Sequence, residues 1–189
     1  MPETYQACVA FDNLVDRDQT LLRASSSVPF LPVQLLRNQH VGRRWRAGGE
    51  EAAITLDLRQ PMPVDTVALM GCSMTQAGSM RVRGSTSDST GQAGEAFDQT
   101  FAGGCNPLYR YQIGLLDQPA AARYVRIDLL EPGAPWIEAG RLFVGIRHRY
   151  RINYAYGWQM ATIDPSQKTK SAGGSTFIDR KRRYRVLDL

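Results

Sequence analysis

The sequence predicts an all-β protein, a jelly-roll-like antiparallel β-sandwich over about residues 10–147. Several segments alternate apolar and polar residues with a period of two, which is typical of a strand that buries one face. These segments are separated by turns rich in Gly, Ser, Asp and Asn. Helices of about ten or more residues, which would indicate a parallel sheet, are absent from the pattern, so an antiparallel sandwich or barrel is favoured.

The alternation is clear enough to assign faces. Ile54 and Leu56 point to one side of their strand, and Val125 and Ile127 do the same in theirs. The segment 32–39, which begins with Pro32, suits a short helix. The expected strands, in chain order, are TLLRASS (20–26), ITLDL (54–58), VDTVALMG (64–71), SMRVRGS (79–85), YRYQIGL (109–115), YVRIDL (124–129) and GRLFVGI (140–146). The last two flank a Pro/Gly break, and we expect them to pair as core strands.

The chain is predicted to divide into a sandwich over residues 1–147 and a C-terminal extension over residues 148–189. About 40 residues rarely support a core of their own, so the extension is expected to be an arm rather than a second domain. Within it, Asp164-Pro165-Ser166 predicts a turn, KTKSAGGS (168–175) an exposed loop, and STFIDRKRRYRVLDL (175–189) a hairpin that turns at Asp179–Arg182.

Charge separates the same two parts. The formal net charge of the 189 residues is +5. Residues 1–146 contain 13 Lys/Arg and 15 Asp/Glu, a net charge of −2, whereas residues 147–189 contain 10 Lys/Arg and 3 Asp/Glu, a net charge of +7. The basic segment can face an acidic partner. No apolar run approaches the ~18–20 residues that cross a bilayer, and the N-terminus lacks a secretory pattern, so we expect no membrane span and no signal peptide.

The catalytic inventory favours a non-enzymatic protein. The chain has no G-x-S-x-G, H-E-x-x-H, P-loop or G-x-G-x-x-G motif, and we expect no catalytic residue, no cofactor and no metal site. A glycosidase with paired carboxylates stays open as an alternative, because such pairs converge only in three dimensions. Asp12, Asp16 and Asp18 could supply oxygen ligands to Ca²⁺, but their spacing differs from an EF-hand, and turn capping is the favoured interpretation.

The cysteines are few and scattered. Cys8, Cys72 and Cys105 form an odd set without C-x-x-C spacing. We therefore expect three small, mostly buried hydrophobic side chains, no disulfide pairing, and synthesis in a reducing compartment.

The order of the segments resembles a galactose-binding-like, discoidin-type jelly roll. The resemblance rests on TLLRASS, VGRRWRAGGE (41–50), the run from Ala52 to Gly71, MRVRGSTSD (80–88) and RYVRIDL…PWIEAGRLFVG. Together with YAYGWQMATIDPSQKTKSAGGSTFIDR (154–180), the order is similar to small structural proteins of tailed-phage and prophage tail operons. The resemblance implies a tail-tip or baseplate component, made in the bacterial cytoplasm and assembled into the virion with other tail proteins. Such assemblies are symmetric, so a homo-oligomer is expected.

Two tryptophans offer a second function, the recognition of host cell-surface glycans. Trp45, Arg46 and Trp136 are the candidate glycan contacts, because aromatic faces stack on sugar rings and guanidinium groups donate hydrogen bonds. Packing in the core or at its rim is the favoured interpretation of each tryptophan, since a large ring beside a strand start usually buries its area.

The basic segment DRKRRYRVLDL (179–189) has three open interpretations. Its candidate assembly residues are Arg180, Lys181, Arg182, Arg183, Tyr184 and Arg185. They can dock on an acidic face of a neighbouring subunit, contact nucleic acid, or form a solvated hairpin. Nucleic acid is the least favoured of the three, because only Tyr184 interleaves the basic residues and no nucleic-acid-binding motif accompanies them.

Overall fold

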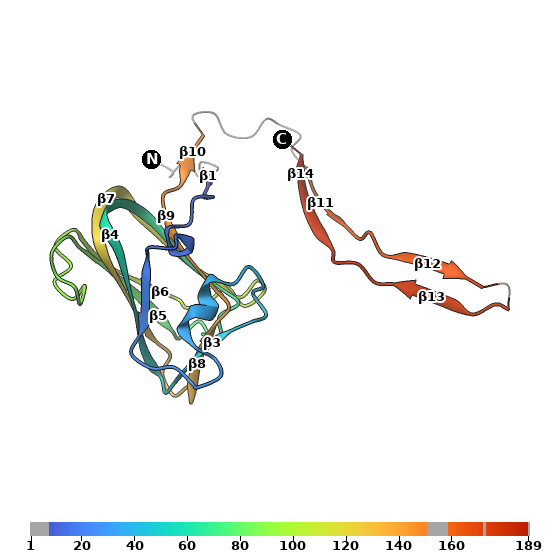
Figure 1. The fold of residues 1–189 in the computed structure, drawn as a ribbon, viewed down its shortest axis with the longest axis horizontal. Helices are drawn as coiled ribbons and strands as arrows, with labels where there is room; N and C mark the ends of the chain where they lie inside the picture. Colours follow the sequence, from blue (N-terminus) through green and yellow to red (C-terminus); the bar gives the residue numbers. More distant parts are fainter. Residues whose placement is uncertain (1–7, 151–158, 172, 189) are drawn as a thin grey trace. The chain divides into compact units, whose positions relative to one another are not determined.

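The computed structural model describes residues 8–150, 159–171 and 173–188, and almost all of their regular structure is strand (Figure 1). Val9–His148 form one compact unit, and the C-terminal strands belong to another. The elements are β1 (Cys8–Val9), η1 (Leu14–Asp16), β2 (Leu21–Ala24), η2 (Val33–Arg37), β3 (Trp45–Gly48), β4 (Glu51–Met70), β5 (Ser79–Ser85), β6 (Phe97–Ala102), β7 (Tyr111–Leu130), β8 (Trp136–Ala139), β9 (Arg141–Gly145), β10 (His148–Arg149), β11 (Gln159–Ile163), β12 (Gln167–Lys170), β13 (Thr176–Asp179) and β14 (Tyr184–Asp188).

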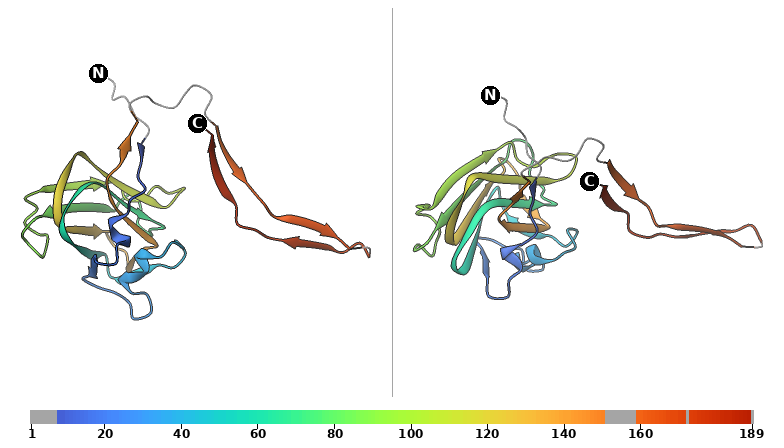
Figure 2. Two further views of the ribbon diagram at one scale, coloured as in Figure 1. Left: turned by 45° about the horizontal axis from the view of Figure 1, so that its top comes forward. Right: turned by 90° about the horizontal axis from the view of Figure 1, so that it is seen from above.

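Two long strands, β4 and β7, pair antiparallel along most of their length and form the centre of the fold. They arch over together, as the teal and yellow strands of Figure 2 show. The first half of β4 lies between β2 and the second half of β7, which continues to β5 and β6. The second half of β4 lies between the first half of β7 and β9. Because the two halves have different neighbours, one bent pair contributes strands to both layers of a sandwich.

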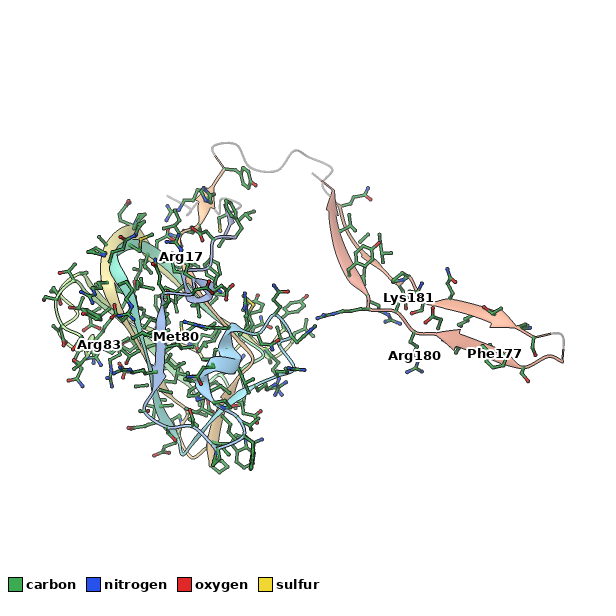
Figure 3. The ribbon with its side chains drawn as sticks, viewed as in Figure 1. Arg17, Met80, Arg83, Phe177, Arg180 and Lys181 are labelled. Atoms are coloured by element: carbon green, nitrogen blue, oxygen red, sulfur yellow. A yellow bond between two sulfur atoms is a disulfide. The ribbon has the colours of Figure 1, made fainter. Side chains whose placement is uncertain are left out.

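The core follows the predicted alternation. Ile54, Leu56, Val125 and Ile127 are buried, while the residues between them, such as Thr55, keep partial exposure. Figure 3 shows the same alternation along β5, with Met80 inside the sandwich and Arg83 at its outer side. The predicted helix forms as the short 3₁₀ turn η2, directly after Pro32. The all-β sandwich predicted from the sequence is confirmed.

Two details of the expected topology are wrong. ITLDL and VDTVALMG are one strand, β4, and YRYQIGL and YVRIDL are likewise one strand, β7. Register shifts between Asp57 and Met62, and between Val64 and Thr66, allow the pair to bend without ending. GRLFVGI, which forms β9, does not pair with YVRIDL, because both strands pair with β4 instead.

The C-terminal strands form a two-stranded ribbon. β11 pairs with β14 and β12 pairs with β13, both antiparallel. The predicted hairpin turn at Asp179–Arg182 is therefore wrong, because this stretch separates β13 from β14, and the chain reverses between β12 and β13. Between β11 and β12, where the sequence predicts a turn, the Ser166 N–H donates to the Asp164 carboxylate at 3.0 Å. Residues 151–158 lie outside the described residues.

The cysteines correct a further expectation. Cys72 and Cys105 are buried and form a disulfide, with their Cα atoms 6.6 Å apart, whereas Cys8 is exposed. The two buried positions agree with the prediction, and the pairing and the exposure of Cys8 do not. Among the described residues, no helix is long and apolar enough to cross a membrane.

Candidate functional site

The short pair β3–β8 displays the aromatic and basic side chains that the sequence selected. Its register places Arg46 opposite Glu138 and Gly48 opposite Trp136. Because side chains alternate along a strand, Arg46, Glu138 and Trp136 share one face, while Trp45 turns to the other. One pair of strands therefore separates the two candidate tryptophans.

Trp45 is a core residue. Its exposed fraction is 0%, and its indole N–H lies 3.0 Å from the Ser27 hydroxyl and 3.2 Å from the Ser26 carbonyl oxygen. The packing interpretation of Trp45 is thus the one that the structure supports. Its ring has no face open to a ligand.

Trp136 is 44% exposed and lies beneath a guanidinium group. The Arg46 Cζ is 4.9 Å from the ring centroid, a cation–π distance. Gly48, directly opposite Trp136, carries no side chain and leaves room for this diagonal contact. Trp136 is the exposed aromatic residue of the site.

Glu138 holds the arginines in place. Its Oε1 accepts a hydrogen bond from the Arg46 Nε at 2.7 Å, and its Oε2 accepts one from the Arg44 Nη1 at 3.1 Å. Its backbone N–H donates to the Ser73 hydroxyl at 2.9 Å, which ties β8 to the loop after β4. We call Arg44, Arg46, Trp136 and Glu138 the Trp136 platform.

The electrostatics of the platform favour an ionised Glu138. Burial raises the pKa of this carboxyl, but the hydrogen bonds and charges of Arg46 and Arg44 outweigh burial and leave the pKa below its usual value. Two guanidinium groups around one carboxylate leave a net charge of +1. The platform therefore offers an aromatic face beside unused N–H donors.

The loops on either side of the platform are tied together by hydrogen bonds. The Gly49 N–H donates to the Pro135 carbonyl oxygen at 2.9 Å, and the Gly133 N–H donates to the Glu50 carboxylate at 2.7 Å. Gly49 and Gly133 have positive φ angles of 91° and 75°, which glycine adopts readily. The exposed ring thus lies on a braced part of the surface.

The architecture can be compared with solved structures. The fold is that of a galactose-binding-like β-sandwich. No protein-family model matches the chain, and no curated protein matches it in sequence.

Three similar structures are carbohydrate-binding modules. One is the family 32 module of NanJ from Clostridium perfringens in complex with galactose, at 11% identity and a TM-score of 0.51 over 68% of this chain and 93% of that one. Another is chitosan-binding module 1 of a chitosanase/glucanase from Paenibacillus sp. IK-5. Its sequence identity is 16% and its TM-score is 0.53, over 71% of this chain and 98% of that one. A third is CpGH89CBM32-5 from Clostridium perfringens in complex with GalNAc-β-1,3-galactose. Its sequence identity is 14% and its TM-score is 0.55, over 71% of this chain and 100% of that one. Identities this low show the fold alone.

The candidate assembly residues lie in and beside the ribbon. Arg180, Lys181, Arg182 and Arg183 occupy the stretch between β13 and β14, and Tyr184 begins β14. The described side chains of this group are exposed, and that of Arg185 lies outside the description. Arg183 Nε donates to Asp164 at 2.7 Å, and the Lys181 N–H donates to the Ser166 hydroxyl at 3.0 Å. Figure 3 shows Phe177, Arg180 and Lys181 projecting from the ribbon.

The acidic loop considered for Ca²⁺ is engaged in ion pairs. Asp12 pairs with Arg17 at 3.0 Å, and Asp16 pairs with Arg141 at 2.5 Å (Arg17 is labelled in Figure 3). In the described part of the chain, no group of three or more His, Cys, Asp or Glu residues could hold a metal ion.

The sequence had indicated part of the platform. Arg46 and Trp136 are candidates from the sequence, whereas the contributions of Glu138 and Arg44 emerge only from the structure. The strand period contained the missing signal: in WRAG, Trp45 is in phase with the small Ala47, and in WIEA, Trp136 is in phase with Glu138.

Proposed function

We propose that the chain is a non-catalytic glycan-binding module and that the Trp136 platform is its contact surface. The observation that carries the proposal is the half-exposed Trp136 ring, which is held by Arg46 and, through it, by Glu138. A ring that is already oriented loses little conformational freedom when a ligand binds.

The platform suits a sugar in two ways. The C–H face of a pyranose can cover exposed indole area of Trp136, which removes apolar surface from water. Arg44 and Arg46 each keep N–H groups beyond those used by Glu138, and these can donate to hydroxyl oxygens. Glu138 fixes the direction of both donors.

The similar structures add support at the level of the ligand class. The NanJ module was solved with galactose, and CpGH89CBM32-5 with GalNAc-β-1,3-galactose. A fold shared with saccharide-binding modules favours a saccharide here, and the residues of the platform carry the specific claim.

A glycan array followed by calorimetric titration tests the proposal. We expect the full chain to bind one glycan class, and Trp136→Ala to weaken that binding at least about tenfold, which is ~1.4 kcal/mol. Phe30→Ala is the matched control, because Phe30 is 91% exposed and lies outside the platform. The proposal fails if the wild type binds no saccharide, or if both variants bind as the wild type does.

A second candidate function is assembly into a phage tail tip or baseplate, with the virion as the location of the protein. The ribbon favours it, because two-stranded hairpins are marginally stable alone and this one exposes apolar side chains. Phe177 is 63% exposed and Ile178 is 50% exposed, beside the basic stretch 180–183. None of the three similar structures described above is a tail protein.

The ribbon can be tested without deleting it. Removing residues 176–189 would strip the partners of both β11 and β12, so the double variant Phe177→Ser/Ile178→Ser is a cleaner change. In a host that assembles the particles, we expect it to disappear from purified tails, as measured by mass spectrometry. Lys168→Ser, an exposed change on the neighbouring strand, is the control. If the double variant is incorporated into tails as the wild type is, the ribbon has no role in assembly.

A further inference from the structure

The outer face of the sheet β2–β4–β7–β5–β6 carries a second, unassigned cluster of charged residues. The strand register aligns them in rows across the sheet. One row runs Arg23, Thr55, Arg126, Arg83, Asp98, and the adjacent row runs Ala53, Asp128, Arg81, Thr100. This face lies opposite the one that buries Ile54 and Ile127, so the sandwich core does not explain its composition.

A groove of about 580 Å³ opens on this face. Its lining includes small residues, such as Ala53, Ser79 and Thr100, from three different strands. Arg81 and Arg126 also line it, on adjacent strands. The hollow therefore forms where short side chains meet long basic ones.

The arginines of the groove exceed the carboxylates that they contact. Arg83 and Arg126 lie directly opposite each other, an unfavourable pairing of like charges. They share one carboxylate: Asp128 accepts from Arg83 at 2.5 Å and from Arg126 at 2.8 Å. Arg81 forms a bidentate pair with Asp98, at 2.8 and 2.6 Å. These five groups carry a net charge of +1, and Glu51, which also lines the groove, brings the total to zero.

The loop between β5 and β6 holds this arrangement. The Gln92 carbonyl oxygen accepts from Arg83 Nη1 at 3.0 Å, and Gly91 packs against Arg126 so closely that a Cβ at position 91 would lie 2.8 Å from the Arg126 Cβ. Within the loop, Asp88 and Glu95 accept several hydrogen bonds from neighbouring backbone N–H and hydroxyl groups, which lower the pKa of each carboxyl to about 2. Both carboxylates are therefore ionised at neutral pH, in the form that accepts these hydrogen bonds.

We propose that this groove binds a carboxylate-bearing sugar, such as a uronate unit of an acidic glycan, with Arg126 and Arg81 as its carboxylate-binding residues. Each guanidinium keeps N–H groups that are not used by Asp128 or Asp98. Ser79, Thr100 and Asp128 supply hydroxyl and carboxylate partners for the hydroxyl groups of the sugar. The charges around the groove nearly balance, which disfavours a polyphosphate and suits a ligand that brings one carboxylate to the arginines.

The site is distinct from the Trp136 platform, since none of the platform residues lines the groove. It adds a ligand class, acidic saccharides, to the proposed glycan binding and does not depend on it. A chain that binds at both places would take two classes of glycan at two separate surfaces.

Titration of the full chain with trigalacturonate at pH 7, beside galactotriose as the neutral probe, tests the site. In Arg126→Gln we expect the affinity for trigalacturonate to fall at least tenfold, while the affinity for galactotriose stays unchanged. Arg23→Gln is the matched control, because Arg23 is exposed in the same row at the edge strand but does not line the groove. Arg126→Lys should bind trigalacturonate with intermediate affinity, since lysine keeps the positive charge but lacks the paired N–H donors of a guanidinium group.

The proposal is overturned if trigalacturonate does not bind the wild type, if Arg126→Gln binds it unchanged, or if Arg23→Gln loses it equally. Trp136→Ala separates the two sites, because it should leave trigalacturonate binding intact. Loss of the acidic probe in Trp136→Ala would place that ligand on the platform instead and would also contradict the groove. Thermal unfolding of each variant shows whether a lost affinity reflects a lost fold.

Discussion

The substitution Glu138→Gln disrupts the carboxylate that holds Arg44 and Arg46 in the Trp136 platform. The substitution keeps the size of the side chain but removes the charge that Arg44 and Arg46 share. The Glu138 side chain is 12% exposed, and those of Arg44 and Arg46 are 43% and 37% exposed. A hydrogen bond to a charged group contributes ~1.5–3 kcal/mol when buried, and an exposed ion pair only ~0.2–1 kcal/mol. For this half-buried network we expect a loss of about 1–2 kcal/mol in the free energy of unfolding.

The pH dependence of that loss has a definite sign. The folded-state pKa of Glu138 is lowered, so its stabilising contribution is fully present above the unfolded pKa and disappears as the pH falls through the folded pKa. The glutamine side chain of the variant does not titrate. The stability difference between wild type and Glu138→Gln should therefore be constant near neutral pH and shrink as the solution is acidified below about pH 4.

Urea denaturation followed by tryptophan fluorescence measures the difference, and Asp18→Asn, which makes the same charge change at an exposed position, is the control. In thermal unfolding we expect a fall in Tm of about 2–8 °C for Glu138→Gln. Glycan affinity should fall about threefold or more, because Arg46 loses the partner that holds it over Trp136. Equal stability of Glu138→Gln and wild type at pH 7, with an unchanged pH profile, would refute this reasoning.

Three further predictions concern other parts of the chain. Trp45→Phe should lower the free energy of unfolding by about 1–3 kcal/mol, through the lost hydrogen bonds of a buried indole, and leave glycan affinity unchanged in calorimetry. Reduction of Cys72–Cys105, which are 33 residues apart, should lower Tm, since such a disulfide stabilises by about 3–4 kcal/mol; an identical Tm with and without dithiothreitol would contradict this. The carboxyls of Glu95 and Asp164 should titrate by NMR with midpoints near pH 2, so their contributions are present above about pH 4 and fade below it; midpoints above 4 would contradict the hydrogen bonds assigned to them.

The sandwich could be predicted because its strands have one buried face. Ile54, Leu56, Val125 and Ile127 are buried where the alternation places them. The extent of β4 could not be predicted from the same pattern, because Arg59, Pro61 and Pro63 interrupt it and are typical of a turn. The strand passes through this stretch with a register shift, and Arg59 adopts a φ of 71°.

Strand pairing was harder to predict than strand position. GRLFVGI follows YVRIDL closely in the chain, so pairing of the two is the simplest expectation, yet β9 pairs with β4 across 70 intervening residues. The ribbon shows the same difficulty, since β14 returns to β11 rather than to β13. Which strand edge is free depends on the whole sheet and is not encoded in a local pattern.

Only part of the candidate site could be predicted, because residue types can be read from the sequence but the side of the strand on which they lie is harder to assign. Composition selected Trp45 and Trp136 equally, and only the phase of each residue relative to its strand neighbours separates a core ring from an exposed one. The groove with Arg81 and Arg126 was missed, because its residues come from strands that are distant in sequence and meet only through the register.

The central claim is that the Trp136 platform binds a saccharide, and an NMR titration of the indole N–H signals tests it most directly. The full chain, with its tryptophan signals assigned through single Trp→Phe variants, would be titrated with the glycan selected on the array. The account predicts a saturable shift of the Trp136 signal and none of the Trp45 signal, because the first ring is exposed and the second is buried. A bound glycan that leaves the Trp136 signal unmoved would contradict it.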